Sequence, residues 1–411
     1  MHRTLWNKDY ILLVQGNAIS TIGDLMYSFA IGYWVYTQTG SKALLGVMSS
    51  ISMFVSMFLS PFCGSIVDKL NRKWLVVLID LVQGLLMLTV GILAYQDALN
   101  IPIVLAVAFL ASFGSVFYSP AINTILLDII PRDDLVRGQS IQSGIHATIN
   151  LVGSAFSGAM VAFFGVPLIV VINGISNLYS AVSEMFIAVP KSVQEGETVS
   201  VKGVLSDFAD AAKIILADPC LRLMIPGALV LNLLGAGAGS LMQPLFLEKG
   251  FSVELYGYAM SIQSVGYLLG VVILGAVKFK PKTRFWMMAI GFTLSTIFFV
   301  TAYFSQAYVL LCIFLFLGSL GNCLGNAVLN ASLMLALPEK NRGAILGLVE
   351  AVCVGGCALS AVIYGVLGDI FPLHLVFAAG SAISLIPMLY ICFHKDTKTF
   401  ISTHGLLLLL W

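Results

Sequence analysis

The sequence predicts an all-α membrane protein with twelve transmembrane helices in two halves of six. Of the 411 residues, 59% are hydrophobic and only 10% are charged, and the mean hydropathy is +0.98. Soluble domains carry about 25% charged residues. Twelve apolar runs are long enough to cross a bilayer, which takes about 20 residues. A polar segment at 190–222 separates six of these runs from the other six.

The apolar runs follow one another through mostly short connections. They cover residues 11–36, 43–66, 74–95, 101–129, 138–163, 166–189, 223–247, 254–277, 284–304, 307–336, 343–369 and 372–393. The first run carries Asp24 and lacks a small-residue cleavage site, so we interpret it as a spanning helix rather than a signal peptide. The expected domains are an N-terminal half at 1–190, a cytoplasmic linker at 191–222, a C-terminal half at 223–394 and a cytoplasmic tail at 395–411.

The distribution of Lys and Arg predicts the orientation in the membrane. If the N-terminus is cytoplasmic, nineteen of these residues lie in inside segments, and only Lys42 and Lys249 lie in outside loops. This excess follows the positive-inside rule. We therefore expect a multi-pass protein of the cell membrane, in a bacterium the plasma or inner membrane, with both termini in the cytoplasm. The net charge of +1 gives no reason to expect a nucleic-acid partner.

The residue pattern does not support enzymatic or metal chemistry. No Walker loop is present, and the five histidines are grouped neither with a nucleophile nor as metal ligands. Cys353 and Cys357 are four residues apart, but no His or carboxylate accompanies them, so we favour helix packing over a metal site. None of the seven cysteines lies in an outside loop, which argues against a disulfide framework. We expect no catalysis, no metal and no cofactor, with a proton gradient as the driving force.

The two halves share a weak internal repeat. Asn123 precedes Pro131 by eight residues near the end of the fourth run, and Asn330 precedes Pro338 by eight near the end of the tenth. Charged residues and an Arg-Gly pair follow each proline. Repeated six-helix halves place a substrate path at their interface near the midplane. The pattern therefore favours a duplicated transporter.

One short segment, GSIVDKLNRK at 64–73, interrupts the apolar pattern with four charges in six positions. It resembles the signature of the major facilitator superfamily in the loop between helices 2 and 3. The matching positions are Gly64, Asp68, Lys69, Arg72 and Lys73. Asn71 stands where the family has a second glycine, and the counterpart in the second half, GAVKFKPKTR, has no acid.

Three further segments, QGNAISTIGD, TGSKALLGV and VPKSV, are similar to the branch with macrolide-type drug exporters and siderophore exporters. The resemblance implies the major facilitator fold. It also implies a conformational latch, in which Asp68 of the signature loop caps the helix that begins at Arg342 and Gly343. Asp128 is expected to pair with Arg72. The alternative is that the loop is a topology anchor with solvated charges.

Ionisable residues inside apolar runs are costly and usually functional. Asp24 is the leading candidate because it lies well inside the first run, with no base nearby in sequence. We predict that it exchanges the coupling proton or binds a cationic drug. The alternative is a structural hydrogen bond to Asn17 or Tyr27. Glu350 and Asp128 are the further candidates for proton coupling.

The other polar residues in the runs have two expected roles. We assign Asp80 and Glu184 to hydrogen bonds between helices, and a lone histidine such as His146 is more often a structural partner. A substrate cavity is nevertheless expected, and its predicted lining is Gln15, Asn17, Tyr27, Tyr118, Asn123, His146, Asn150, Asn232, Gln243, Gln263, Tyr267, Asn322, Asn326 and Asn330.

These features together predict a secondary active transporter that uses protons to export amphipathic organic compounds such as macrolide-like drugs. Within transport, the alternatives are export of siderophores and flipping of lysophospholipids. The alternative of another class is a membrane receptor or scaffold without turnover. Uptake in place of efflux stays open. The expected partners are a small organic substrate, protons and the lipid bilayer, and the chain is expected to act as a monomer.

Overall fold

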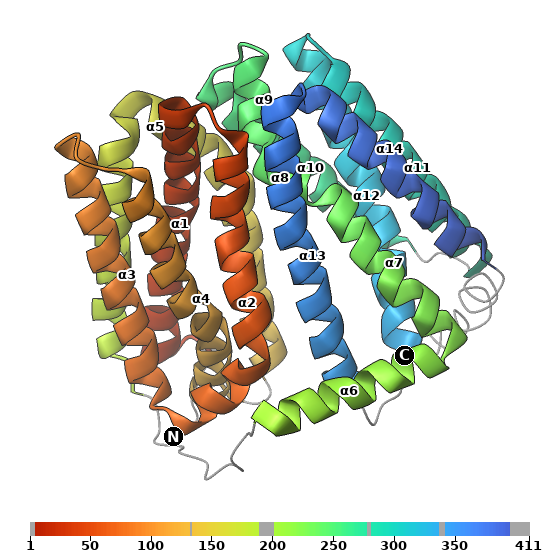
Figure 1. The fold of residues 1–411 in the computed structure, drawn as a ribbon. Helices are drawn as coiled ribbons and strands as arrows, with labels where there is room; N and C mark the ends of the chain where they lie inside the picture. The colour runs from red at the N-terminus through yellow and green to blue at the C-terminus, as the bar shows by residue number, and fades with distance from the viewer. Residues whose placement is uncertain (1–4, 132–133, 189–200, 278–280, 337–341, 395–411) are drawn as a thin grey trace. The chain divides into compact units, whose positions relative to one another are not determined.

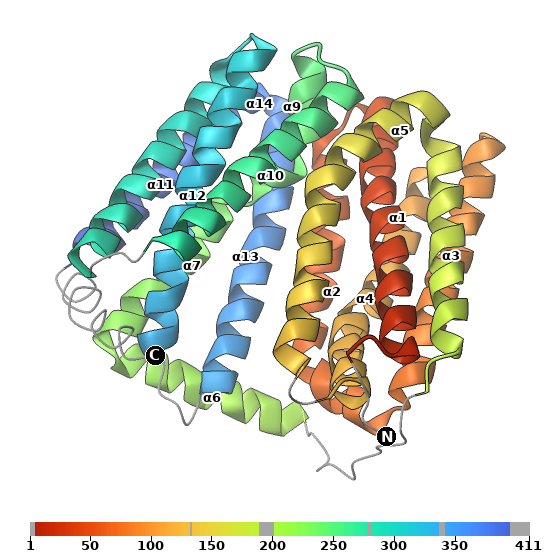
Figure 2. The same ribbon diagram turned by 180° about the vertical axis from the view of Figure 1, so that it is seen from behind.

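The computed structural model describes residues 5–131, 134–188, 201–277, 281–336 and 342–394. Every regular element in these ranges is a helix (Figures 1 and 2). The helices are α1 Lys8–Thr39, α2 Lys42–Lys69, α3 Arg72–Tyr95, α4 Ile101–Ile129, α5 Leu135–Met185, α6 Val201–Ala217, α7 Pro219–Gly235, α8 Gly237–Ser240, α9 Met242–Glu248, α10 Val253–Ala276, α11 Pro281–Phe304, α12 Tyr308–Ala336, α13 Arg342–Ile370 and α14 Leu373–Phe393. The predicted all-α class is confirmed.

Ten candidate membrane spans occur in the described residues. The longest, Arg137–Met185, has 49 residues, which is roughly 74 Å of helix and more than twice the roughly 30 Å of a bilayer core. Gly165 divides it, because its backbone has φ 75° and ψ 166°, a conformation that favours glycine. The chain is therefore a multi-pass membrane protein, while the count of twelve crossings stays a prediction.

One predicted helix is divided. The sequence predicts a single helix over 223–247, whereas the structure has α7, α8 and α9 in succession. The break falls in the segment GAGAGS at 235–240, where each glycine is about 1 kcal/mol less favourable in a helix than alanine. The single-helix prediction is wrong here because it weighed apolar character and not backbone propensity.

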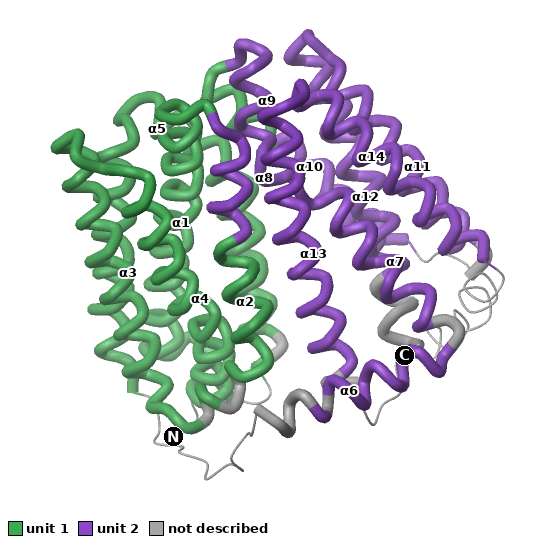
Figure 3. The backbone as a smooth tube through the Cα atoms, in the orientation of Figure 1, with its two compact units in different colours: residues 1–40, 51–200, 252–261 green, residues 41–50, 201–251, 262–411 purple. Residues whose placement is uncertain are grey.

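The chain forms two compact units, coloured separately in Figure 3. Unit 1 comprises residues 1–40, 51–200 and 252–261, and unit 2 comprises residues 41–50, 201–251 and 262–411. Two helices are shared between them, since the first residues of α2 belong to unit 2 and the first residues of α10 belong to unit 1. The predicted domain limits at 1–190, 191–222, 223–394 and 395–411 stay a prediction.

In unit 1, α1 and α3 pack along α5, and α4 packs on α3. Gly23 brings α1 very close to α5, because a Cβ at this position would lie 2.2 Å from Ser176 Oγ and 2.6 Å from Asn173 Oδ1. A larger side chain at this position would force the side chains of Ser176 and Asn173 to move. The close approach places the next residue, Asp24, beside a polar face of α5.

In unit 2, α11 packs on α12 and α14, while α7 packs on α13 and α14. Helix α13 also satisfies the backbone around the break after α7. Ser360 Oγ accepts a hydrogen bond from Gly237 N at 2.8 Å, and the Tyr364 hydroxyl donates to the Leu234 carbonyl. The backbone groups that the break removes from helical pairing thus find partners on α13.

The predicted linker contains helix α6, which belongs to unit 2. Its buried residues Ala211 and Ile215 pack against Ile345 and Val349 of α13. Four apolar side chains in one cluster hold α6 along the first turns of α13, at the opposite end of that helix from Asp369. The part of the linker at 191–200 lies outside the described residues.

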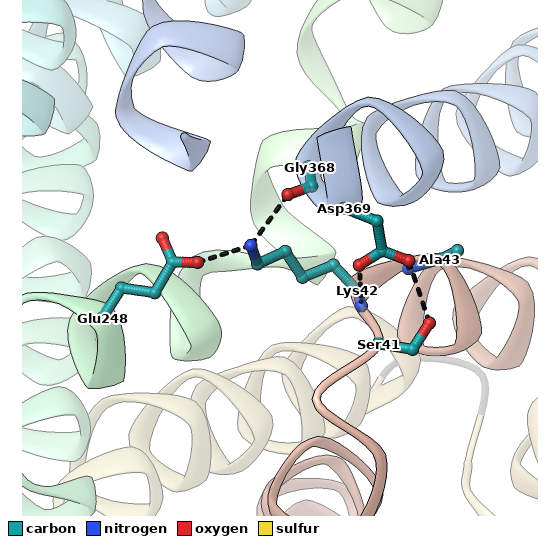
Figure 4. A network of polar contacts seen from close by, with 6 residues as sticks. All are labelled: Ser41, Lys42, Ala43, Glu248, Gly368 and Asp369. Atoms are coloured by element: carbon teal, nitrogen blue, oxygen red, sulfur yellow. Dashed lines mark hydrogen bonds and ion pairs between the residues drawn. The ribbon is translucent and has the colours of Figure 1, made fainter. Parts of the chain in front are cut away.

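A polar network joins the start of α2 to the end of α13 within unit 2 (Figure 4). The carboxylate of Asp369 accepts hydrogen bonds from Lys42 N at 2.7 Å, Ala43 N at 3.2 Å and Ser41 Oγ at 3.0 Å. These amides open α2 and have no partner within the helix. A carboxylate from another helix therefore caps α2, where the positive end of its dipole favours a negative charge.

Lys42 completes this network. Its Nζ lies 2.5 Å from Glu248 Oε1 and donates to the Gly368 carbonyl at 2.7 Å. The Lys42 side chain is only 13% exposed, so the pair is partly shielded from solvent. The other base predicted for the outside loops, Lys249, donates to the Ser305 carbonyl at 2.8 Å, and burial lowers its pKa.

We expect Asp369→Ala to lower the stability of the protein by about 1 kcal/mol, the usual effect of losing a helix cap. Thermal unfolding of the purified protein measures this effect. Asp210→Ala is the matched control, because the Asp210–Lys213 pair is exposed on both sides and such pairs contribute little. An equal or smaller loss of stability for Asp369→Ala than for Asp210→Ala would contradict the capping role.

Candidate functional site

Unit 1 contains a cavity of about 230 Å³ between α1, α3, α4 and α5. Its lining is Asn17, Ser20, Thr21, Asp24, Asp80, Gln83, Ser115, Tyr118, Ser119, Ile122, Asn123, Gln142 and His146. The lining is almost entirely polar and includes two carboxyl groups. Among these described residues, none is a lysine or an arginine.

Asp24 lies on the wall of this cavity, and its side chain is accessible from it. Asn177 Nδ2 donates to Asp24 Oδ1 at 3.3 Å, and Asn177 is itself held by the backbone and side-chain oxygens of Asn173 at 3.0 and 2.8 Å. The partner is thus an amide on α5, and not Asn17 or Tyr27 of the same helix, as the structural alternative supposed. An accessible carboxyl group without a basic partner in the lining suits reversible binding of a proton or a cation.

Asp80 of this cavity and a third carboxyl group, Glu184, meet at Tyr118 of α4. The Tyr118 hydroxyl lies 3.1 Å from Glu184 Oε1 and 3.5 Å from Asp80 Oδ2, and both acids are only 2% exposed. The predicted hydrogen bonds between helices are therefore present. A phenol carries one hydrogen, so it can donate to only one of the two carboxyl groups at a time. In the described part of the chain, Glu184 Oε2 has no hydrogen-bond partner.

Sequence reasoning missed the polar face of α5 that joins these groups. Asn173, Asn177, Ser180 and Glu184 are spaced by four, three and four residues, which places them on one face of a helix. That spacing was readable in the sequence. The contact between this face and Asp24 was not readable in the sequence, because the periodicity of one helix does not identify the helix that it packs against.

A partly buried ion pair lies at the end of the segment 64–73, which resembles the superfamily signature. Arg72 NH1 lies 3.0 Å from Asp128 Oδ2, with Arg72 8% and Asp128 23% exposed, as expected from the sequence. Asn71, the departure from the family pattern, is the N-cap of α3 and accepts from Trp74 N at 3.4 Å. Lys73 Nζ lies 5.8 Å from the centre of the Trp74 ring.

The rest of the predicted latch is only partly described. Lys69 is exposed. The side chains of Asp68 and Arg342 lie outside the described residues, and Gly64 and Gly343 have none, so the contact predicted for Asp68 stays a prediction.

Unit 2 contains a larger cavity, of about 880 Å³. Its polar lining includes five of the predicted residues, and these are Asn232, Gln263, Tyr267, Asn322 and Asn326. Met224, Leu231, Phe292, Phe299 and Met388 are among its apolar lining. The cavity is bordered by the break after α7, since Gly235, Gly239 and Met242 also line it.

Several predicted residues line neither cavity. Gln15 donates to Ser183 Oγ at 3.5 Å, and Asn150 donates to the His146 carbonyl at 3.0 Å. Tyr27 packs against a hydrophobic core cluster of unit 1, and Gln243 is buried on α9.

Four further positions from the sequence predictions lie on α12 and α13, and these are Asn330, Glu350, Cys353 and Cys357. Glu350 is exposed on α13 and is not part of the cavity wall. The side chain of Asn330 lies outside the described residues. Of the two cysteines on α13, Cys353 lines the unit 2 cavity and Cys357 Sγ donates to Asn232 Oδ1 at 3.3 Å.

Comparison with known proteins places this architecture among transporters. The model of the Major Facilitator Superfamily matches residues 13–243 and 227–403. The macrolide efflux protein A of Streptococcus pyogenes is 22% identical over 45% of this chain and 46% of its own length, so that match spans less than half of either protein. The multidrug efflux pump Tap of Mycolicibacterium fortuitum is 22% identical over 87% of both chains.

Solved structures share the fold at low sequence identity. A bacterial homologue of the human lysosomal transporter Spinster aligns with a TM-score of 0.67 at 14% identity and covers 95% of both chains. A bacterial homologue of the iron transporter ferroportin aligns with a TM-score of 0.70 at 16% identity, over 94% of this chain and 98% of that one. The family match extends over most of the chain, and the helical architecture agrees with it. The chain therefore belongs to the Major Facilitator Superfamily.

Proposed function

We propose that the protein is a proton-driven exporter of amphipathic organic compounds. Relatives named for macrolide and multidrug efflux, found by sequence comparison, support the class of substrate. The excess of Lys and Arg in the predicted inside segments supports a cell-membrane location with both termini in the cytoplasm. The signature loop at 64–73 would act as the conformational latch of the transport cycle.

The observation that carries the coupling proposal is the cavity around Asp24. Asp24 and Asp80 both line it, and Glu184 is linked to Asp80 through Tyr118. Three carboxyl groups gathered among membrane-spanning helices, without a basic residue in the cavity lining, are expensive unless they bind positive charge. Protons supply that charge, and their release on the other side of the membrane would drive export.

Proteoliposomes containing the purified protein test this function. A panel with a macrolide, a lipophilic dye, a siderophore and a lysophospholipid is loaded, and flux is measured with and without an imposed pH gradient. We expect the macrolide or the dye to move only when the gradient is present. Gradient-independent flux, or movement of the siderophore or lysophospholipid alone, would contradict the proposal and favour the corresponding alternative.

A further inference from the structure

We propose that the 880 Å³ cavity inside unit 2 is a binding site for uncharged organic molecules that offer hydrogen-bonding groups on an apolar frame. The proposed function is needed only to name this ligand a substrate. The internal repeat predicts a substrate path between the two halves. This cavity is instead lined by residues of unit 2 alone.

The lining carries no formal charge. Among the described residues that border the cavity are amides, hydroxyls, a thiol, methionines and aromatic rings, but no Asp, Glu, Lys, Arg or His. An organic cation that entered would lose hydration without gaining a carboxylate, and an anion would find no base. The cavity therefore selects against charge of either sign, in contrast to the acidic cavity of unit 1.

The amide groups have defined hydrogen-bonding capacity left for a ligand. Asn326 Nδ2 donates to the backbone oxygen of Asn322 at 3.0 Å and to Asn322 Oδ1 at 2.8 Å, which uses both of its hydrogens. In the described part of the chain, Asn322 Nδ2 and Asn326 Oδ1 make no other hydrogen bond. The amide nitrogen of Asn322, with two hydrogens, and the amide oxygen of Asn326 thus remain for a ligand on α12.

A third amide is oriented in the same way. Asn232 Nδ2 donates to the Ala228 carbonyl at 2.9 Å, and Asn232 Oδ1 accepts from Cys357 Sγ at 3.3 Å. Both contacts fix the rotation of the side chain, so its second amide hydrogen has a set direction. Polar groups held in place by their own partners give orientation and specificity to a ligand in an otherwise apolar pocket.

The size of the cavity fits a drug-sized ligand, and the glycines at the break after α7 keep part of it open. Pockets for such ligands typically measure about 300–1,000 Å³, and this one is within that range. Gly235 and Gly239 border it, and a Cβ built on either would meet nothing within 4 Å. The glycines of the divided helix therefore leave open space that a larger residue would fill.

This open space allows a sharp test, because the side chain of Gly235→Leu should reduce the cavity and its Cβ meets nothing within 4 Å. Gly275→Leu is the matched control, since a Cβ at Gly275 also meets nothing within 4 Å and Gly275 does not line the cavity. The probes are dansylcadaverine, which carries an ammonium group, and its uncharged N-acetyl derivative. Fluorescence of each probe is titrated with the purified full-length protein in nanodiscs, without any gradient.

We expect the N-acetyl probe to bind at least about tenfold more tightly than the cationic probe, a difference of about 1.4 kcal/mol. Gly235→Leu should abolish this binding, while Gly275→Leu should leave it unchanged. Asn322→Leu should weaken it as a second, independent variant, which keeps the test decisive if Gly235→Leu does not fold.

Equal or tighter binding of the cationic probe would overturn the proposal. Unchanged binding in both Gly235→Leu and Asn322→Leu would do the same. Binding is measured here without transport, so an absence of gradient-driven flux would refute the proposed function and leave this site standing. Normal gradient-driven flux without binding to this cavity would refute this site and leave the proposed function standing.

Discussion

Replacing Asp24 by Asn is expected to abolish transport driven by a pH gradient, while the protein still inserts and folds. Asparagine has nearly the same size as aspartate and can still pair with Asn177, which lies 3.3 Å from the carboxylate. It cannot gain or lose a proton in the physiological range. The substitution therefore removes the charge change and keeps the packing of α1 against α5.

The measurement is substrate flux in proteoliposomes with an imposed pH gradient, compared with flux without one. In the variant, the two rates should be equal. Asp97→Asn is the matched control, because Asp97 lies in the turn after α3 with φ 54°, a conformation that asparagine also tolerates. Binding of the uncharged dansyl probe should be unchanged in Asp24→Asn, because Asp24 belongs to the cavity of the other unit.

Gradient-driven flux at the wild-type rate in Asp24→Asn would show that this carboxyl does not carry the coupling proton. Asp80 and Glu184 would then be the next candidates, since they are buried and share Tyr118. Glu350 ranks below them, because it is exposed and does not line the cavity of unit 2.

Replacing Arg72 by Ala is expected to destabilise the protein by about 3 kcal/mol. Removal of one partner from a buried ion pair typically costs about 3–5 kcal/mol. The lower end applies because Asp128 keeps 23% of its side chain exposed. Loss of the guanidinium would also loosen the contact between the start of α3 and the end of α4.

Thermal unfolding of the purified variants in detergent measures this effect. Arg222→Ala is the control, since Arg222 is exposed on α7. The double variant of Arg72→Ala with Asp128→Ala should regain part of the lost stability, because the carboxylate that the guanidinium faces is removed together with it. An unchanged melting temperature for Arg72→Ala would contradict the expected role of the pair. So would a loss of stability in the double variant that exceeds the summed losses of the two single variants.

Much of the architecture was predictable from the order of residues alone. A chain that is 59% hydrophobic and 10% charged has to bury its backbone polar groups in helices if it spans a bilayer. The pairing of Arg72 with Asp128 was also predictable, because both positions belong to the predicted cytoplasmic ends of neighbouring helices. Likewise, Asn232, Asn322 and Asn326 were recognisable as cavity residues, since amides are rare in apolar runs.

Other features were decided only by the tertiary structure. Asp24 meets Asn177, and Asp80 meets Glu184 through Tyr118, because close packing at Gly23 and along α5 selects which helix faces touch. The capping of α2 by Asp369 joins residues more than 300 positions apart. Helical periodicity tells which side chains share a face, whereas the partner of that face depends on how small residues let whole helices approach.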